Sequence, residues 1–371
     1  MADMNITPAR AGLTPQAWDD KFFTEFVRKN AFVRYMGESI TDMIQIREDL
    51  TRKPGDTINF AAVRRLVGAG VTGNQILEGN EELLDARSMK LAIGALRHAV
   101  AVSDWDEQKN AFDLRDAARD ALQVWALEKM KADLILSLTA ITANTSIQIP
   151  FVSATAAQRN FWLANNSDRI LFGAARSNNA GNVMATSLLN IDAAGDKLTT
   201  GMISLVKRMA RNANPRIRPI MTKDGTEWYV MFVNSWQMRD LRADPVMIQA
   251  LQQAADRGKD NPLFASGDLI WDAVIIREIP ELPVITAAGA GAPAIDVAMA
   301  LLCGAQALGI AWGQRTKSTT NTRDYGYMHG VGVQEMRGIG KLRFGRDPTV
   351  DDNAPVDQGI ATLFTASTGD A

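Results

Sequence analysis

The longest helical pattern in the chain covers residues 104–140. In its first half, apolar residues recur every three or four positions, which predicts one face turned to a core and one face turned to solvent. From Ala126 onward the apolar residues spread around the helix, so we expect that half to be covered from several sides. The expected core face of the first half contains Leu114, Ala117, Ala118, Ala121, Leu122, Val124 and Trp125.

Other elements must run beside this helix, because an average helix has only about 11–12 residues. Two arrangements are compatible with the pattern: a bundle of helices, or a spine along a domain built from strands that are distant in sequence. Two starts are compatible with capping chemistry, namely Asp104 with Glu107 three residues later, and Asn110 just before Phe112. The helix is therefore expected to begin at one of these positions or in two steps.

Two extended patterns precede the long helix. Residues 57–66 and 89–102 alternate or cluster apolar residues as strands do. The connection between them contains Gly68, Gly70, Gly73 and Gly79. Connections of this length inside compact domains are usually functional or disordered. The sequence therefore predicts a projecting hairpin.

The second half of the chain alternates strand and helix patterns between Pro215 and Pro283, which predicts an α/β lobe. A helix is expected to begin at Thr199 or Thr200 and to end before Pro215. Strand 228–233, a turn of helix capped by Ser235 and a helix from 245 to 253 are expected to follow.

Three further segments have weaker patterns. Residues 158–195 are rich in Asn, Ala and Ser and are expected to be irregular. Residues 297–314 carry no charge, but their glycines and alanines make them only weakly hydrophobic, so we expect a buried strand with a short helix and no membrane span. Short strands around residues 325–344 are expected to return to the first lobe.

Three large aromatic residues mark the N-terminal region. Thr14 and Pro15 are a good cap and first-turn pair, and Trp18, Phe22 and Phe26 then recur every four residues. Such a stripe either packs on the core of its own chain or docks on a neighbouring molecule, where aromatic anchors dominate the binding energy.

Composition narrows the functional classes. The 371 residues exceed the usual size of a single core, so two or more lobes are expected. Lys plus Arg number 40 against 42 Asp plus Glu, so any contact with nucleic acid should be local and weak. The N-terminus lacks the basic and apolar regions of a secretory signal, which fits synthesis in the cytoplasm.

No catalytic, cofactor or metal site is expected. The single Cys303 excludes an internal disulfide, and His98 and His329 alone cannot build a zinc-type cluster. Gly68, Gly70 and Gly73 spell G-x-G-x-x-G after a strand, but Gly79 interrupts any following helix. The nearest acidic residue of the right kind, Asp85, also follows too closely, since about 20 residues are usual. His98 is expected to pack or hydrogen-bond within the hairpin.

Several short motifs follow one another before and within the long helix. They read Gly55-Asp-Thr-Ile-Asn-Phe60, Gly68-Ala-Gly-Val-Thr-Gly73, Leu77-Glu-Gly-Asn-Glu-Glu82, Arg97-His-Ala-Val100, Phe112-Asp-Leu-Arg115 and then Trp125. In this order and spacing the chain resembles the major capsid proteins of tailed double-stranded DNA bacteriophages with the Hong Kong 97-type fold. Asp168-Arg-Ile-Leu-Phe-Gly173 is a weaker match, and elsewhere only the order of elements agrees.

The resemblance implies an α+β fold with five parts. They are an N-terminal arm (1–50), an extended-loop hairpin (51–103), a peripheral domain with the spine helix (104–213), an axial α/β domain (214–290), and return strands to the peripheral domain with a C-terminal tail (291–371). In such proteins the extended loop lies over a neighbouring subunit.

The function implied by the resemblance is structural. Copies would form hexamers and pentamers that close an icosahedral shell around the phage DNA, without catalysis, cofactors or a membrane. The shell would assemble in the host bacterial cytoplasm, with a separate scaffolding protein, a portal and a decoration protein as candidate partners. A separate scaffolding protein is expected because the aromatic arm begins by Trp18. Two alternatives are a shell that encloses cargo enzymes and an enzyme that binds a nucleotide through Gly68, Gly70 and Gly73.

The residues expected at contacts between subunits lie in the arm and the hairpin. They are Trp18, Phe22 and Phe26 in the arm and Arg64, Arg65, Glu78, Glu81, Glu82 and Arg87 in the hairpin. The charged residues are candidates for ion pairs between copies, although a solvated loop would have the same composition.

Overall fold

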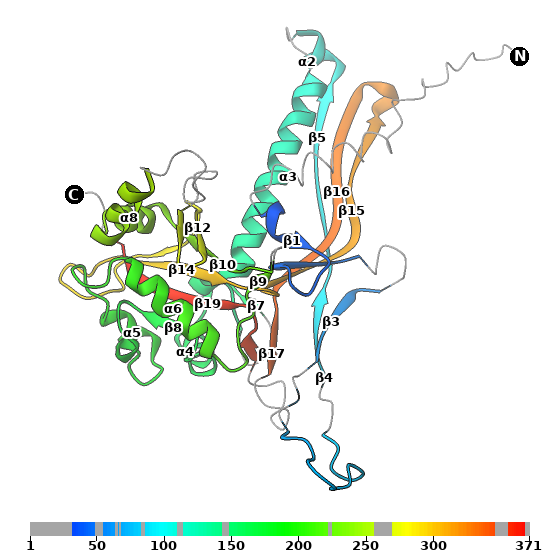
Figure 1. Ribbon diagram of the computed structural model, residues 1–371. Coiled ribbons are helices and arrows are strands. Elements are labelled where there is room, and N and C mark those ends of the chain that lie inside the picture. Colours follow the sequence, from blue (N-terminus) through cyan, green and yellow to red (C-terminus); the bar gives the residue numbers. More distant parts are fainter. Residues whose placement is uncertain are drawn as a thin grey trace, which may run out of the picture.

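Two sheets that share no strand form the framework of the fold (Figure 1). An eight-stranded sheet lies within a lobe of helices, and a five-stranded sheet extends from the lobe as an arm beside the longest helix. A two-stranded hairpin projects on the side opposite the arm. The computed structural model describes residues 32–48, 55–63, 66, 68–82, 86–109, 114–142, 148–221, 225–255, 269–345 and 355–367.

The sheet of the lobe is mixed. Its main order is β11-β12-β10-β14-β19-β8, with β13 beside β14 and β9 beside β10. Only the β10–β12 and β19–β8 pairs are parallel. Every residue of β14 and β19 is buried, as in strands that are covered on both faces. The bounds are β8 Ile170–Phe172, β9 Ile220–Met221, β10 Glu227–Val233, β11 Leu269–Trp271, β12 Val274–Glu278, β13 Val284–Ile285, β14 Val297–Cys303 and β19 Ile360–Ala366.

Alternate residues of these strands feed two cores. Val230 and Phe232 of β10 face one core, which also contains the lobe end of the long helix, whereas Met231 faces the other. That second core is covered by α6 (Thr200–Asn212), α7 (Ser235–Arg242) and α8 (Pro245–Ala255). The predicted strand 228–233 and the helix from 245 are confirmed.

The arm sheet has the order β1-β2-β15-β16-β5, with the long helix α3 (Leu114–Thr139) along one face. Val331 and Val333 of β16 share a core with α3, and Arg337 donates to Asp133 of α3 at 2.6 Å. The helix is therefore a spine along distant strands and not a bundle member. The strands are β1 Met36–Gly37, β2 Ile44–Arg47, β5 Gly94–Ser103, β15 Leu308–Arg323 and β16 Met328–Lys341.

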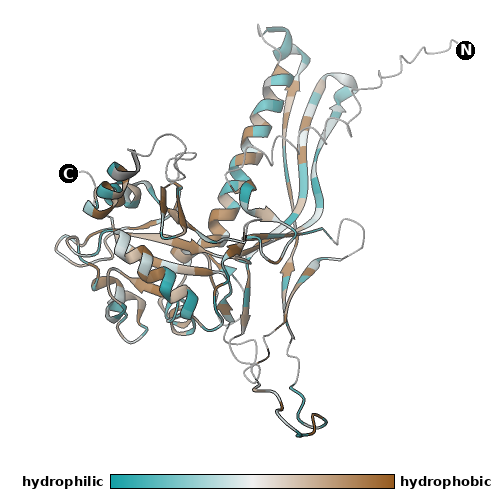
Figure 2. Ribbon diagram, viewed as in Figure 1, coloured by the Kyte–Doolittle hydropathy of each residue, from teal (hydrophilic) through white to brown (hydrophobic). Residues whose placement is uncertain are grey.

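The buried side of α3 is narrower than the sequence predicts. Its central stripe recurs every four residues and contains Ala118, Leu122, Ala126, Met130, Leu134 and Leu138. Ala121 and Val124, expected on the core face, are exposed, because among the described residues only the sheet covers this half and both residues point to the side of the stripe. The lobe end is buried on several sides, as predicted, and Figure 2 shows the change from hydrophilic to hydrophobic along the helix.

The start of the spine is divided between α2 (Asp104–Lys109) and α3. Ser103, not Asp104, caps α2, because its Oγ accepts the N–H of Asp106 at 3.2 Å. The carboxylate of Asp104 instead lies 3.2 Å from Arg115 and 2.9 Å from Nε2 of His329. The second candidate cap, Asn110, lies outside the described residues.

The projecting hairpin is confirmed and consists of β3 (Thr57–Val63) and β4 (Ala86–Ala92). Its inner side chains, among them Phe60 and Leu91, form a small core with Leu342 and Phe344. The predicted run 89–102 is two strands, because the chain leaves β4 after Ala92 and enters β5 of the arm sheet at Gly94.

Several expectations for the second half were wrong. Residues 158–195 are not irregular: they include most of α4 (Ala156–Asn165), strand β8 and α5 (Met184–Leu189). Thr155 and Gln158 form a capping box at α4 that the composition obscured. Residues 297–314 contain no helix, since β14 and β15 lie on either side of a short turn, and the strands at 325–344 are long. The lack of charge in residues 297–314 reflects the burial of these residues in two sheets.

Two helix caps also differ from expectation. The side chain of Thr199 caps nothing; instead Asp244 Oδ2 accepts the N–H and the Oγ1–H of Thr200, both at 2.8 Å. The cap of α7 is Asn234 with Gln237, one residue before the expected Ser235.

The expected domain divisions do not coincide with sheet boundaries. The lobe sheet takes β8 from before residue 214 and both β14 and β19 from after residue 290.

Two small sheets complete the fold: β6 (Ile141–Thr142) with β7 (Gln148–Ile149), and β17 (Arg343–Gly345) with β18 (Pro355–Asp357). Within the ranges given above, no helix is long and apolar enough to cross a membrane.

Candidate assembly surfaces

No described element covers one face of the arm sheet over its far half. His98 stacks on Trp125 of α3 at 4.5 Å between ring centroids, so the side chains before and after it in β5 point away from the helix. The same alternation applies to β16 and β15 through their antiparallel pairing. We call this surface the outer arm face. It contains Ala95, Arg97, Ala99 and Ala101 of β5, Gln334 and Met336 of β16, and Lys317, Thr319 and Arg323 of β15.

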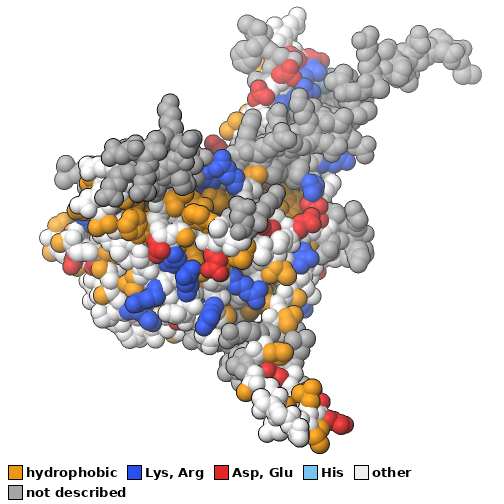
Figure 3. Space-filling model, in the orientation of Figure 1, with side chains coloured by type: hydrophobic (Ala, Val, Ile, Leu, Met, Phe, Trp, Pro, Cys, Tyr) orange, Lys and Arg blue, Asp and Glu red, His pale blue; other side chains and the backbone are white. Residues whose placement is uncertain are grey.

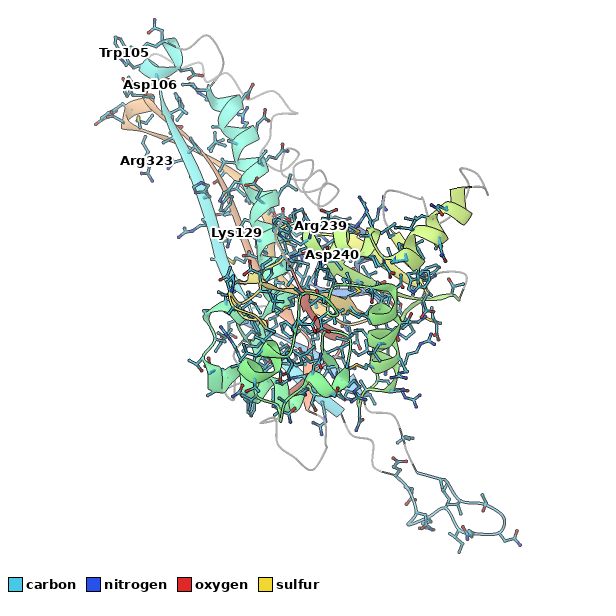
Figure 4. The ribbon with its side chains drawn as sticks, turned by 90° about the vertical axis from the view of Figure 1, so that its left-hand side faces the viewer. Trp105, Asp106, Lys129, Arg239, Asp240 and Arg323 are labelled. Carbon is cyan, nitrogen blue, oxygen red and sulfur yellow. The ribbon has the colours of Figure 1, made fainter. Side chains whose placement is uncertain are left out.

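The outer arm face is basic. Lys317 and Arg97 lie on either side of Gln334 in one cross-strand row, and Arg323 lies near the end of the arm (Figure 4). None of these three cations has a hydrogen bond or ion pair within the described ranges, and none of the residues that form the face is acidic. Met336, which is 43% exposed, adds an apolar contact surface.

The connection between β3 and β4 carries the opposite charge. We call residues 68–82 the hairpin tip; they include three glutamates and neither lysine nor arginine. Ile76 and Leu77 at its turn are 72% and 62% exposed. The N–H of Asn80 donates to Leu77 O at 2.9 Å, and its Nδ2 donates to Ile76 O at 3.0 Å. The turn therefore presents two apolar side chains among acidic ones.

The predicted hairpin residues have different roles. Glu81 and Glu82 accept the backbone N–H groups of Gly79 and Gly68 at 2.7 and 2.6 Å, so they shape their own loop. Glu78 is exposed and has no such bond within the described ranges. Arg87 lies in β4 opposite Ala62. Whether these charges pair between copies stays a prediction, and Trp18, Phe22, Phe26, Arg64 and Arg65 lie outside the described residues.

The glycine motif does not have the geometry of a dinucleotide site. Gly70 and Gly73 both have a φ of +69°, and no helix follows within residues 68–82. A phosphate site of this type requires the last glycine to open a helix. These glycines instead allow the backbone turns of the exposed tip.

The far end of the arm exposes aromatic residues that the sequence did not indicate as a group. Tyr325 lies in the β15–β16 turn with a φ of +51° and is fully exposed. Trp105 in α2 and Tyr327 are 56% and 45% exposed. Figure 4 places Trp105 and Asp106 at the end of the arm. The sequence did not reveal this group because Trp105 and Tyr327 are about 220 positions apart along the chain. The pairing of β5 with β16 brings them to the same end of the arm.

A buried ionic group joins the arm to the lobe. Asp357 Oδ2 accepts hydrogen bonds from Lys341 Nζ at 3.1 Å and Trp162 Nε1 at 3.0 Å. Asn166 accepts the N–H of Asp357 at 2.9 Å, and Arg169 donates to its carbonyl. Since Lys341 and Asp357 are each 2% exposed, the group is structural and offers no surface to a partner.

Two further titratable groups are likewise buried. Burial raises the pKa of the Cys303 thiol to about 12, which keeps it protonated. Burial also raises the pKa of Glu335, although Arg337 and the Thr316 hydroxyl act in the opposite direction.

His98 packs on the spine and not within the hairpin, contrary to expectation. No cluster of three metal-binding side chains occurs in the part of the chain described here.

Comparison with known proteins identifies the family. The sequence matches the family described as "Phage capsid protein" over residues 7–368. The chain belongs to this family. The "Major capsid protein" of Pseudomonas phage KPP25 is 27% identical to this chain over 365 residues, covering 94% of each chain.

Solved structures agree with the assignment of this chain to the phage capsid family. It resembles a chain of the "Cyanophage Pam1 capsid asymmetric unit" with a TM-score of 0.80 and 30% identity over 100% of both chains. It shares its fold with the "Capsid of Ralstonia phage GP4", at a TM-score of 0.72 and 24% identity over 92% of both chains. The α+β arrangement of lobe, arm and hairpin is therefore a phage capsid fold.

Proposed function

We propose that this protein is the major capsid protein of a tailed double-stranded DNA phage and has the Hong Kong 97-type organisation. Its copies form hexamers and pentamers that close an icosahedral shell around the genome. Membership in the phage capsid family and the full-length likeness to the Pam1 capsid chain support this proposal. Assembly in the host cytoplasm with a scaffolding protein, a portal and a decoration protein belongs to the same proposal.

The parts of the subunit are assigned from the fold. The hairpin β3–β4 serves as the extended loop, and α3 with the arm sheet serves as the peripheral domain. The axial domain is built on the lobe sheet, including β14 and β19, because β14 lies near its centre and β19 pairs with β14 along its whole length. Residues 291–371 therefore contribute to both domains.

The observation that carries the assembly proposal is the separation of two complementary surfaces. The acidic hairpin tip and the basic outer arm face lie at opposite ends of one subunit (Figure 1), so contact between them requires two copies. Opposite charges favour the encounter and fix its register. Ile76 and Leu77 could pack on the alanines and on Met336 of the arm face.

Modest pairwise energies suffice for such a shell. Burial of a large apolar side chain contributes about 1.5–3 kcal/mol, of which association entropy consumes a part. A head-to-tail contact of this kind closes a ring when its rotation is that of a hexamer or pentamer. Each copy then has a neighbour on both its tip and its arm, and the energies add around the ring.

The proposal is tested by reversing charge on one side and restoring it on the other. Glu78→Lys changes an exposed tip residue that makes no bond within the loop, and we expect shell yield to fall in electron micrographs. Adding Lys317→Glu and Arg323→Glu should restore it. The matched control is Glu128→Lys, an exposed glutamate on the solvent side of α3.

Two outcomes would contradict the proposal at different levels. Normal shells from Glu78→Lys, or equal loss from Glu128→Lys, would remove the tip-to-arm contact. A wild-type protein that stays monomeric when expressed with its neighbouring genes would remove the capsid function itself.

A further inference from the structure

Helix α6 carries a second basic surface, on the lobe. Its inner side, including Met202 and Val206, is buried against the lobe sheet, while Arg208 and Arg211 are exposed. The chain then turns back along the helix in an extended segment, and Arg216 and Arg218 are exposed beside it. Figure 3 shows Lys and Arg side chains gathered where Figure 1 places α6. We call these four arginines the α6 patch.

The backbone under the patch is fixed at nearly every residue. Ala213 and Ile217 point inward and are buried, which directs Arg216 and Arg218 outward. The bonds that hold the segment are Ile217 N–H to Ala210 O at 3.1 Å, Tyr229 O–H to Ile217 O at 3.0 Å, Arg169 to Pro215 O at 3.1 Å and Ala305 N–H to Arg218 O at 2.8 Å. The arginines therefore extend from a rigid base.

Most of the positive charge of the patch is unpaired. Arg211 faces Glu227 at 3.2 Å, and both side chains are 51% exposed, so this pair is solvated and weak. Arg208, Arg216 and Arg218 have neither a hydrogen bond to their side chains nor an ion pair in the part of the chain described here. The nearby carboxylate of Asp168 is engaged by Arg169 and by the N–H of Asn214.

We propose that the α6 patch faces the interior of the shell and binds the phosphate backbone of the enclosed duplex DNA. The inference rests on the proposed capsid function. Guanidinium groups present a planar fork of donors that suits phosphate oxygens. Contacts to phosphate carry no sequence information, as a wall around a whole genome requires.

The chemistry of the patch favours DNA over the acidic hairpin tip of a second copy. The tip exposes Ile76 and Leu77, which need apolar surface on their partner. Residues 200–218 expose no large apolar side chain, whereas the outer arm face offers Met336. The α6 patch is thus a surface of charge alone, and charge alone is what a phosphate backbone recognises.

Weak binding of DNA by the α6 patch is consistent with the net charge of the whole chain. The formal net charge is −2, so the lobe patch is a local exception and not part of a general basic surface. A few phosphate contacts per subunit, repeated over the shell, offset repulsion between wall and genome without trapping the DNA during packaging.

The test is the salt dependence of DNA binding by the unassembled full-length protein, with a random-sequence duplex followed by fluorescence anisotropy. Each phosphate contact contributes about 0.9 to the slope of log K against log salt. Removing three contacts with Arg208→Gln, Arg216→Gln and Arg218→Gln should therefore reduce the slope by about 2.7. The matched control, Arg97→Gln, Lys317→Gln and Arg323→Gln, removes three cations from the arm that have no ion pair with a described residue, and it should leave the slope unchanged.

Further variants separate the remaining explanations. Lysine at the same three α6 positions should retain the slope, which shows that the effect follows charge and not misfolding. An unchanged slope in the glutamine variant, or an equal loss in the arm control, would overturn the proposal. So would binding of a peptide of residues 68–82 that the α6 substitutions abolish while DNA binding persists. Shell formation by the α6 variants, scored in micrographs, reports separately on the capsid function.

Discussion

The two halves of β15 differ sharply although they belong to one continuous strand. Residues 308–312 are all buried, and 308–311 lie between β2 and β16, whereas residues 319–323 are all exposed and, among the described strands, pair with β16 alone. The first half stabilises the subunit, and the second half holds a surface away from the lobe. One strand thus serves the fold at one end and, in the assembly that we propose, the contact with a second copy at the other.

The largest expected difference concerns two lysines of the arm sheet. Lys341 is buried and paired with Asp357, while Lys317 lies on the outer arm face without an ion pair to any described residue. Lys341→Ala leaves a buried carboxylate without its cation and should cost about 3–5 kcal/mol in the free energy of unfolding. Lys317→Ala should change it by no more than about 0.5 kcal/mol. Denaturant unfolding measures both, and similar values would erase the distinction between the lobe end and the far half of the arm sheet.

A smaller difference is expected between two residues of β15 itself. Ile310 is completely buried, and Thr320 is exposed. Ile310→Ala removes apolar contacts and leaves a cavity, so we expect a loss of about 2–5 kcal/mol. Thr320→Ala should stay within about 0.5 kcal/mol. A large loss at Thr320 would mean that the far half of the arm also supports the fold.

The smallest expected effect is a difference in pH-dependent stability between Asp244, a carboxylate of the lobe, and Asp324, a carboxylate of the arm. Burial acts to raise the pKa of Asp244, but hydrogen bonds from Thr200 and Val246 outweigh it and hold the pKa below its ordinary value. Asp244 therefore stabilises the fold above an unfolded pKa of about 3.9, and this stabilisation is lost as the pH falls through the lower folded pKa.

Replacement of Asp244 measures that contribution. Asp244→Asn weakens the cap of α6 and should cost about 0.5–2 kcal/mol at neutral pH. The difference from wild type should shrink in acid, as followed by urea unfolding at several pH values. Asp324→Asn at the exposed arm turn is the control and should show neither effect. A constant difference across the pH range would exclude the charge of Asp244 as its cause.

Local sequence patterns predicted elements better than their partners. The spine, the hairpin, the strand at 228–233 and the helix from 245 were all readable, because each depends on the spacing of neighbouring residues. The cap of α6 was not, because Asp244 lies far along the chain from Thr200. The long strands β15 and β16 were also missed, since their polar far halves lack the apolar alternation of a covered strand.

The sequence and the structure each revealed different features of the two surfaces. The acidic character of residues 68–82 is visible in the sequence, but the use of Glu81 and Glu82 within their own loop is not. The outer arm face joins Arg97 to Lys317 across Gln334, and no spacing in the sequence connects these positions. Register decides which side chains share a face of a sheet, and a shift of one residue would turn each of them to the spine.

The sequence by itself determined the long spine helix, the glycine-bearing hairpin and the family, because periodicity, turn residues and motif order are properties of short segments. The tertiary structure alone decided which charges meet on the arm, which arginines surround α6 and which carboxylate caps it. Those groupings arise from pairing between strands and from packing between distant elements. Their energies depend on neighbours that only the folded chain brings together.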